Sequence, residues 1–557
     1  MPVRKIEKAP SAYDYPLLIK NLLRPPLRYF PDREIIYKNT VRYSYLTLEK
    51  RIARLAAGLE RMGVRQGDTI SVMEWDSHRY LECFFAIPMM GCVLHPINVR
   101  RPAESLIHTI NHAESRVLLA NADFIPAIES IQDRLTSLKA VILLADDDTH
   151  LETSLPVTAE YESMLAQSDG VFSFPDFDEN AMAAIFYSTG AAGIPKGVCF
   201  SHRQLVLHTY GIMAGLCSYG FHPSVNAGDV YMPLTPMFHV NAWSLFYLFT
   251  LLGAKQVYPG KYDPATILKL IADEGVTFSH CDPPLVHTLI NCPEIQSAGL
   301  SGWKVIVGGA PLSKSVCRTA LSLGIDLCSV YGMAETGPML TAALLKPEML
   351  SWDIERQVEV RCRTGLPTPM VDIEVTDRTG APLPHDGKSI GEVVLRAPWL
   401  TQGYAKDPEK SEKLWVDGWL HTGDIGFIDS EGYLQITDRT LDAIKSGGEW
   451  IDAVALEDMI CQHEAVSEAA VTAIPDEKYG ERPLAFVVLK EGYRGRVEEE
   501  DLRSFLIARV KEGGLSRRGV PDKIAVVDTI PTTSVGKISK KQLLKQHKST
   551  FSLEDGP

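Results

Sequence analysis

A single lysine stands within a run of glycines and small residues between Tyr187 and Val198, which reads YSTGAAGIPKGV. The apolar run Ala183–Phe186 precedes it and predicts a buried strand that leads into a loop. A loop of this composition exposes backbone N–H groups that can hold phosphates, and Lys196 adds a positive charge. It is not a Walker A loop, because the pattern G-x-x-x-x-G-K-S/T is absent. Composition alone leaves a second interpretation open, a glycine-rich turn with a solvated lysine.

Other residues of chemical interest lie further along the chain. Asp424 follows the turn HTG, where an aspartate taken alone indicates an Asx-turn or a helix cap. His239 and Trp243 stand four residues apart, so on a helix they would share one face, although core packing is an equal alternative for the tryptophan. Lys445 and Lys537, taken alone, are solvated surface lysines.

Apolar spacing predicts the elements that position these residues. Apolar residues from Leu48 to Met62 recur every three or four positions and Gly63 follows, which predicts an amphipathic helix with a glycine stop. Short apolar runs that predict strands alternate with helical stretches, and these runs are Thr69–Met73, Arg116–Leu119, Ala140–Leu144, Val276–His280 and Lys304–Val307. This alternation favours a layered α/β architecture.

Later parts of the chain change in character. From Asp372 to Tyr433, short runs separated by Gly, Asp and Pro predict the antiparallel strands of a small β subdomain. After Asp438 a compact tail follows, with predicted helices at Ala455–His463 and Glu500–Val510 and predicted strands at Ala469–Ala473 and Ala485–Leu489. We therefore expect an α/β protein with a large N-terminal domain over residues 1–437 and a small α+β C-terminal domain over residues 438–557.

Length and composition agree with a multidomain globular protein. A chain of 557 residues is too long for one hydrophobic core. A net charge of -14 argues against nucleic-acid partners, so anionic substrates must meet local cations. The 10 cysteines form no metal-ligand spacing, which favours reduced thiols in a cytoplasmic protein. We expect no membrane span, because the longest apolar segments are too short to cross a bilayer.

Eight segments, in order along nearly the whole chain, resemble a known family. They are Tyr187–Val198, PMFHVNAW (Pro236–Trp243), GGAPL (Gly308–Leu312), YGMAET (Tyr331–Thr336), GEVVLRAPWLTQGY (Gly391–Tyr404), GWLHTGDIG (Gly418–Gly426), DRTLDAIKSGGEWI (Asp438–Ile451) and PTTSVGK (Pro531–Lys537). With them the chain resembles the adenylate-forming superfamily of acyl-CoA synthetases, firefly luciferases and peptide-synthetase adenylation domains. The resemblance implies an ATP-dependent acid–CoA ligase, which joins a carboxylic acid to AMP, releases pyrophosphate and then transfers the acyl group to coenzyme A.

The resemblance implies roles for the charged residues of the first step. A carboxylate must attack the α-phosphate of ATP, so cations have to stand between two anions. By resemblance, Glu335 holds Mg²⁺, Lys196 and its loop hold the β- and γ-phosphates, and Lys537 bridges the carboxylate and the α-phosphate. The other loop positions implied for ATP binding are Ser188, Thr189, Gly190, Ala191, Ala192 and Gly193.

Further positions correspond to the nucleoside and acyl sites of the family. Tyr331 would stack on adenine, and Asp424 would accept the ribose hydroxyls with support from Arg439. The adenine slot would also contain Gly309, Ala310, Pro311, Gly332, Met333, Ala334 and Thr336. The acyl site would be lined by His239, Trp243, Gly308 and Gly332.

The second step implies a mobile C-terminal domain. Family members rotate this domain about a hinge, here Leu441, which withdraws the lysine matching Lys537. The rotation brings a second loop to the acyl-adenylate, and its residues here are Lys445, Ser446, Gly447, Gly448, Glu449 and Trp450.

The sequence departs from its family in the phosphate loop and at the hinge. Ala191 and Ala192 occupy two places that usually hold threonine, Ala334 stands where Thr or Ser is common, and Leu441 stands where Asp or Lys is usual. Each lost hydrogen bond to a phosphate costs roughly 1.5 to 3 kcal/mol. We therefore predict weaker ATP handling, which threonine at both loop positions should reverse.

Two other functions remain open from the sequence. One is an enzyme that loads an acyl or aryl group on a carrier protein, although the segment around Trp243 offers no aspartate for an amino-acid ammonium group. The other is a catalytically weakened nucleotide-binding relative. The chain looks closest to medium-chain fatty-acyl and methylthiopropionate-like ligases, which predicts a short to medium aliphatic acid, with an aromatic acid as the alternative. Relatives are commonly homodimers.

Overall fold

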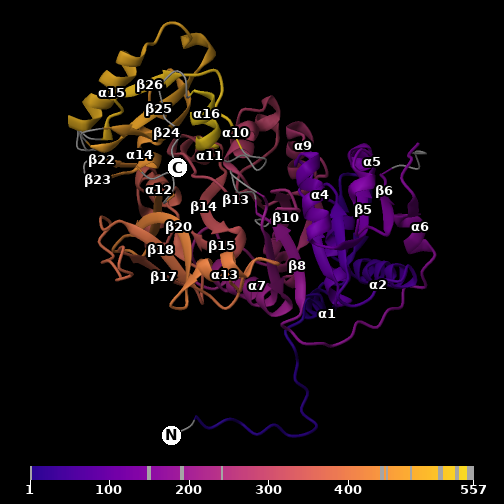
Figure 1. The fold of residues 1–557 in the computed structure, drawn as a ribbon. Coiled ribbons are helices and arrows are strands. Elements are labelled where there is room, and N and C mark those ends of the chain that lie inside the picture. Colours follow the sequence, from indigo (N-terminus) through magenta and orange to yellow (C-terminus); the bar gives the residue numbers. More distant parts are fainter. Residues whose placement is uncertain are drawn as a thin grey trace.

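The computed structural model describes residues 3–146, 152–188, 194–239, 243–439, 444–446, 449–476, 479–511, 519–532 and 538–547. Within these ranges the strands form four sheets, and helices cover them (Figure 1). The predicted α/β fold, with a small β subdomain and a small C-terminal unit, is confirmed. No helix in the described ranges is long and apolar enough to cross a membrane.

The first sheet has the strand order β7-β6-β5-β3-β4-β8-β9, and only the β8–β9 pair is antiparallel among the pairs described. Its strands are β3 (Thr69–Met73), β4 (Val93–Pro96), β5 (Ser115–Asn121), β6 (Ala140–Leu144), β7 (Val157–Glu160), β8 (Met182–Tyr187) and β9 (Gly197–Ser201). The neighbouring helices are α2 (Tyr45–Arg61), α3 (His78–Met89), α4 (Ala103–His112), α5 (Ile125–Glu129) and α6 (Tyr161–Ala166). The predicted first helix is α2, which Ser44 caps and which ends before Gly63 at a φ of 85°.

The second sheet has the order β16-β15-β14-β13-β12-β10-β11-β1-β2, and its central strands are parallel. Its strands are β1 (Glu34–Tyr37), β2 (Val41–Ser44), β10 (Val230–Leu234), β11 (Lys255–Tyr258), β12 (Phe278–Cys281), β13 (Lys304–Val307), β14 (Asp326–Met333), β15 (Gly337–Ala342) and β16 (Leu366–Pro367). The helices near it are α1 (Arg24–Tyr29), α7 (His202–Cys217), α8 (Trp243–Leu251), α9 (Pro264–Glu274), α10 (Pro283–Ile290), α11 (Lys314–Ser322) and α12 (Ile354–Arg361).

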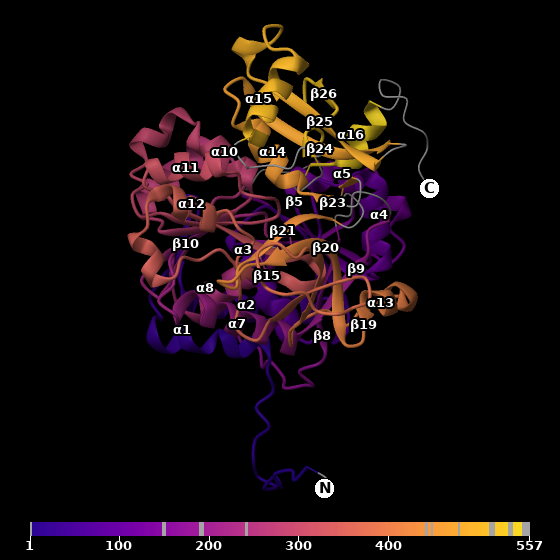
Figure 2. The same ribbon diagram turned by 90° about the vertical axis from the view of Figure 1, so that its left-hand side faces the viewer.

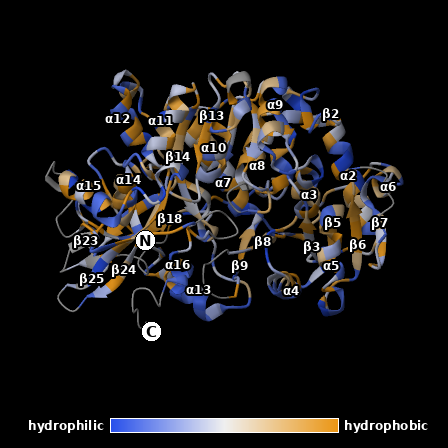
Figure 3. Cartoon of the chain, turned by 90° about the horizontal axis from the view of Figure 1, so that it is seen from above, coloured by the Kyte–Doolittle hydropathy of each residue, from blue (hydrophilic) through white to orange (hydrophobic). Residues whose placement is uncertain are grey.

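The hydrophobic core follows this layering. The largest cluster contains side chains of α2, α3, α7 and α8 together with strands of both sheets, so these helices lie between the sheets. Helices α9 to α12 cover the outer face of the second sheet, and α4 and α5 cover the outer face of the first. Figure 3 shows the hydrophobic residues gathered on the strands and the hydrophilic ones on the outer helices. The loops after β10, β12, β13 and β14 therefore meet at one edge of the second sheet, where ligands of parallel sheets bind.

A third, antiparallel sheet confirms the predicted β subdomain. Its strands are β17 (Asp372–Thr376), β18 (Gly391–Arg396), β19 (Trp415–Val416), β20 (Trp419–Ile428) and β21 (Leu434–Arg439), and α13 (Pro408–Leu414) lies beside them. Strand β20 pairs with β18, β19 and β21, and so carries the GWLHTGDIG segment through the middle of the sheet.

The fourth sheet lies at one end of the molecule in both ribbon views (Figures 1 and 2). Its strands are β22 (Ile444–Ser446), β23 (Glu449–Ile451), β24 (Val466–Asp476), β25 (Gly480–Leu489) and β26 (Lys523–Val526). Its helices are α14 (Ala453–Cys461), α15 (Glu499–Lys511) and α16 (Lys540–Gln546), and the two predicted tail helices correspond to the first two of these. Strand β21 ends in the third sheet and β22 begins the fourth, and the division between residues 437 and 438 stays a prediction.

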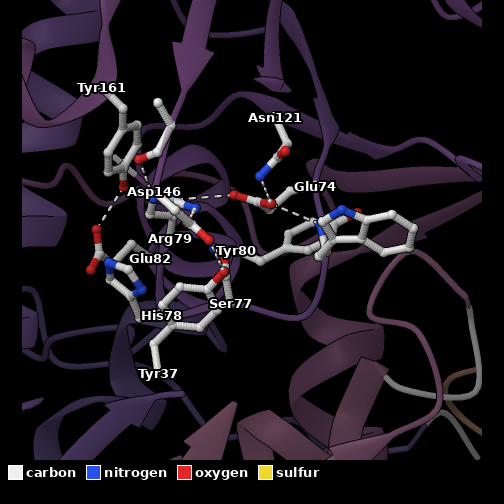
Figure 4. Close-up of polar contacts among 12 residues, drawn as sticks. Tyr37, Glu74, Ser77, His78, Arg79, Tyr80, Glu82, Asn121, Asp146 and Tyr161 are labelled. Carbon is white, nitrogen blue, oxygen red and sulfur yellow. Dashed lines mark hydrogen bonds and ion pairs between the residues drawn. The ribbon is translucent and has the colours of Figure 1, made fainter. Parts of the chain in front are cut away.

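A polar network, buried except at Asp146, ties the two large sheets together (Figure 4). Arg79, in α3, donates from Nε to Glu74 Oε2 at 3.0 Å and from Nη2 to Asp146 Oδ1 at 2.6 Å. Asn121 donates to the other Glu74 oxygen at 2.7 Å, and the Tyr37 hydroxyl of β1 donates to Asp146 at 2.8 Å. Because Tyr37 belongs to the second sheet and Glu74 follows β3 of the first, these bonds fix one sheet against the other.

Candidate active site

The lysine predicted to hold phosphates lies where β8 and β9 form an antiparallel hairpin. Tyr187 pairs with Gly197, the Ser188 N–H donates to the Lys196 carbonyl at 2.9 Å, and Arg101 donates to the Ser188 carbonyl at 2.6 Å. These bonds hold both ends of the loop. The residues between them, Thr189, Gly190, Ala191, Ala192 and Gly193, lie outside the described part of the chain.

The Lys196 ammonium lies over the ring of Tyr404, 4.5 Å from its centroid. The Tyr404 hydroxyl donates to Glu335 Oε1 at 2.8 Å, and Glu335 is buried with 7% of its surface exposed. Burial, followed by the Glu335 charge, raises the pKa of Tyr404, so the phenol stays a donor. One aromatic ring therefore joins a cation and a carboxylate that the sequence places 139 residues apart, from 196 to 335.

Short local bonds hold Glu335 in place. It lies in the turn Ala334–Thr336 at the end of β14, where the Thr336 hydroxyl accepts from the Met333 N–H at 3.0 Å. The Glu335 carbonyl accepts from the Thr401 N–H at 2.9 Å. Both backbone and side chain of Glu335 thus contact the segment that ends in Tyr404.

A second polar pair joins β14 to the β subdomain. The Tyr331 hydroxyl donates to Asp424 Oδ2 at 2.5 Å, and Asp424 is buried within β20. Asp424 lies within a long strand and not at a helix end, and its Cα partner across the sheet is Arg439. The structure therefore brings two of the predicted nucleoside residues together.

The segment GGAPL follows β13 and leads to α11. The Gly308 N–H donates to the Cys281 carbonyl at 3.1 Å, and a Cβ on Gly308 would stand 2.9 Å from Val330 Cγ2. Gly309 has a φ of 89°, a conformation that favours glycine. Ala310 and Pro311 complete the turn before the Ser313 cap of α11.

A narrow cavity of about 20 Å³ lies beside Gly308, between α8 and the second sheet. Its lining is mostly apolar and consists of Thr235, Leu245, His280, Cys281, Ile306, Gly308, Val330 and Met339. Gly308 and Val330 adjoin Gly309 and Tyr331 in the chain, so the cavity begins where the nucleoside residues end. Its size holds about one water molecule.

His239 lies in a turn and not in a helix. Its N–H donates to the Pro236 carbonyl at 2.8 Å, and α8 begins only at Trp243. The helical spacing that would place both side chains on one face therefore does not apply to His239. The same turn is anchored by Asp76, whose buried carboxyl accepts from the Met237 N–H at 2.7 Å.

Several predicted residues lie outside the described part of the chain. These residues are Leu441, Gly447, Gly448 and Lys537. The side chains of five others also lie outside it, and they belong to Trp243, Arg439, Lys445, Glu449 and Trp450. Ser446 is described and is buried in β22, where its hydroxyl accepts from Arg482 at 3.2 Å.

The carboxylate set suits Mg²⁺ bound through a substrate. In the described ranges no group of three or more His, Cys, Asp or Glu side chains could hold a metal ion. Mg²⁺ usually keeps several waters and binds through one or two carboxylates and substrate phosphates. A single buried Glu335 near Lys196 fits that pattern, whereas a dedicated all-protein metal cage does not.

Sequence reasoning missed three residues at this site: Tyr404, Arg101 and Asp76. Tyr404 ends the predicted motif Gly391–Tyr404, but nothing in the motif indicates its contact with Glu335. Arg101 and Asp76 follow strands of the first sheet, far from any motif. The one feature of the sequence that could have pointed to them is their position in a loop after a buried strand, where functional residues often lie.

Comparison with known proteins decides the family. A model of the AMP-binding enzyme family matches residues 25–405, and a model of the AMP-binding enzyme C-terminal domain matches residues 455–537. This chain belongs to the AMP-binding enzyme family. The predicted membership of the adenylate-forming superfamily is thereby confirmed.

Several CoA ligases are similar to this AMP-binding enzyme, and the similarity extends over nearly their full lengths. A long-chain-fatty-acid–CoA ligase of Thermus thermophilus is 38% identical, over 92% of this chain and 91% of its own. A 3-methylmercaptopropionyl-CoA ligase of Ruegeria lacuscaerulensis is 33% identical, over 96% and 98%. The structure of ATP-bound MatB from Rhodopseudomonas palustris is 25% identical, with a TM-score of 0.81 over 96% of this chain and 99% of that one. The predicted class, an AMP-forming acid–thiol ligase that uses ATP and CoA, is confirmed.

Proposed function

We propose that this chain activates a short to medium aliphatic carboxylic acid with ATP and Mg²⁺ and transfers it to coenzyme A. One observation carries the proposal: Lys196 and Glu335 both contact Tyr404, Glu335 follows β14, and Gly308, which follows the neighbouring strand β13, lines a narrow cavity. A cation and a metal-binding carboxylate beside an apolar cavity suit the joining of a phosphate to an acyl carboxylate.

In the first step the two charged residues act on the triphosphate. The Lys196 ammonium binds the β- and γ-phosphates together with backbone N–H groups of the loop from Ser188. Glu335 would hold Mg²⁺, which neutralises charge on the phosphates, and the Tyr404 hydroxyl keeps one oxygen of that carboxylate oriented. Tyr331 stacks on adenine, and Asp424, with Arg439, accepts the ribose hydroxyls.

The remaining roles fall on the C-terminal residues. Lys537 bridges the acid carboxylate and the α-phosphate during adenylation. Rotation of residues 438–557 about Leu441 then withdraws that lysine and presents the loop that begins at Lys445 for the attack of the CoA thiol.

The cavity supports an acid of limited length. Leu245 of α8 and Met339 of β15 are among the residues that line it. Because the cavity itself has room for about one water molecule, an acyl chain must displace packed side chains, and the number displaced grows with its length, which favours a short acid. The expected cytoplasmic location and homodimer stay predictions.

Graded straight-chain acids from acetate to dodecanoate test the proposal. ATP–pyrophosphate exchange and release of AMP with free CoA should both peak at short to medium lengths. Glu335→Gln should abolish both without changing the urea midpoint by much more than Glu359→Gln, a control in an exposed ion pair of α12. Exchange without thioester on free CoA would instead favour a carrier-loading enzyme, and no exchange at all would favour a non-catalytic nucleotide-binding protein.

A further inference from the structure

One polar side chain at the cavity stands out from its apolar lining. His280 of β12 is buried, with 4% of its surface exposed, and it lines the cavity with Leu245, Ile306 and Val330. Its Nδ1 lies 3.3 Å from the hydroxyl of Tyr231, and the two rings are stacked. Its Nε2 is buried and has no hydrogen-bond partner in the part of the chain that the structure describes.

The imidazole of His280 is neutral at physiological pH, because burial lowers its pKa to about 3. A neutral imidazole carries one N–H, and the Tyr231 hydroxyl decides which nitrogen has it. Tyr231 is fully buried, and burial raises its pKa well above the usual value, so it keeps a proton to donate. If Tyr231 donates to Nδ1, the Nε2–H remains as a donor at the cavity without an acceptor.

An unpaired donor buried in an apolar cavity is costly, and that cost points to a ligand. A water molecule there would satisfy the donor when no acid is bound, because the cavity has room for about one. An alkyl tail that displaces this water leaves the N–H unpaired, whereas a tail that carries an oxygen at the same point replaces the bond.

The depth of His280 sets where on the acid that oxygen must lie. His280 pairs with Ile306 across β12 and β13, and Ile306 stands two residues before Gly308, the lining residue that adjoins the predicted nucleoside segment. Two strand residues span about 6.6 Å, and an extended chain advances about 1.2 Å per bond. The oxygen should therefore lie about five bonds from the carboxyl group, within a range of about four to six.

We propose that this site selects short acids that carry a hydroxyl at the far end, with the His280 Nε2–H as the donor that recognises it. The inference rests on the proposed function, since it names the class of acid that enters the same cavity. His280 is then a specificity-determining residue, and Tyr231 is a positioning residue that fixes its tautomer. This contact is a hydrogen bond at the far end of the acid and moves no proton, so the chemistry of adenylation at the carboxyl group is unchanged.

Three pairs of acids of equal length test the inference, each a hydroxy acid and the alkyl acid in which a methyl group replaces the hydroxyl. They are 4-hydroxybutyrate with pentanoate, 5-hydroxypentanoate with hexanoate, and 6-hydroxyhexanoate with heptanoate. We measure kcat/KM for each acid by AMP release with CoA. The parent protein should prefer the hydroxy acid by about tenfold or more in at least one pair, because only that acid pairs the buried donor.

Variants assign the preference to His280. His280→Leu should lower the ratio of the two kcat/KM values by about tenfold or more, mostly by faster use of the alkyl acid, and His280→Gln should keep part of the ratio because its amide donates. Tyr231→Phe should lower the ratio less, since the tautomer is then unfixed. His202→Leu, at a buried histidine of α7 outside the site, should leave the ratio unchanged.

Each outcome separates this inference from the proposed function. Turnover of alkyl acids with no hydroxy preference in any pair overturns the role of His280 and leaves the ligase standing. The same holds for a preference that His280→Leu leaves intact. If no acid of either kind supports pyrophosphate exchange, the proposed function fails and the inference fails with it. Should His280→Leu not fold, His280→Gln and Tyr231→Phe decide the matter, since a hydroxy preference that both variants leave intact overturns the role of His280.

Discussion

Replacement of Tyr404 by phenylalanine tests the charge arrangement on which the site depends. The change removes one oxygen and keeps the ring, so Lys196 retains the aromatic face that lies 4.5 Å from it. The change removes the 2.8 Å hydrogen bond to Glu335, a residue with only 7% of its surface exposed to solvent. A variant this small isolates the orientation of the metal-binding carboxylate.

The expected loss follows from the strength of that bond. A hydrogen bond to a charged group contributes about 1.5 to 3 kcal/mol, and about 1.4 kcal/mol corresponds to a tenfold change. Tyr404→Phe should therefore lower kcat/KM for ATP by about 10-fold to 150-fold. The loss should shrink as Mg²⁺ is raised, because excess metal compensates for a poorly oriented ligand.

The assay is ATP–pyrophosphate exchange at saturating acid over a range of Mg²⁺ concentrations, with urea unfolding in parallel. Tyr433→Phe is the matched control, since its buried hydroxyl donates to the Leu344 carbonyl at 2.7 Å, away from the site residues. That control should lose about 1 kcal/mol of stability and no activity. Exchange within twofold of the parent for Tyr404→Phe, or an equal loss for Tyr433→Phe, would refute the reasoning.

Three further changes test burial, cavity size and the polar core. Burial raises the pKa of Asp76 to about 7, above about 3.9 in the unfolded chain, so its contribution to stability is present below about pH 4 and is lost as pH rises through 7. In Asp76→Asn this fall in stability with rising pH should vanish, and urea midpoints measured at pH 4.5 and 7.5 for the variant and the parent would reveal it. Gly308→Val should raise KM for hexanoate about tenfold more than KM for acetate, because even its Cβ meets a wall of the cavity. Arg79→Met should cost about 3 to 5 kcal/mol in urea unfolding by leaving Glu74 buried without its cation, and adding Glu74→Gln should recover part of the loss.

The sequence predicts the elements of this fold well where the pattern is local. Strands such as Thr69–Met73, Ala140–Leu144 and Lys304–Val307 match their predicted bounds, because a short apolar run between turns leaves little choice of structure. The β subdomain was equally predictable from its turn residues. The four-residue spacing of His239 and Trp243 did not predict the turn at His239. Such a spacing places two side chains on one face only where the backbone is helical.

The site was predictable in its parts and not in their contacts. Lys196, Glu335 and Asp424 stand in segments whose composition or resemblance points to ATP. Their neighbours come from distant parts of the chain, as when Tyr331 of β14 donates to Asp424 of β20. Such pairs depend on how sheets pack, and neither periodicity nor a motif records which side chain faces which.

The segment from Thr401 to Tyr404 shows why this matters for function. Its Thr401 N–H binds the Glu335 carbonyl and its hydroxyl binds the Cys199 carbonyl of β9, while Tyr404 bridges Val198 of the same strand. One short segment thus contacts the first sheet, which carries the phosphate lysine, and the second, which carries the acidic residue. Because neither sheet alone sets the distance between those charges, this segment must be in place before ATP can meet both of them.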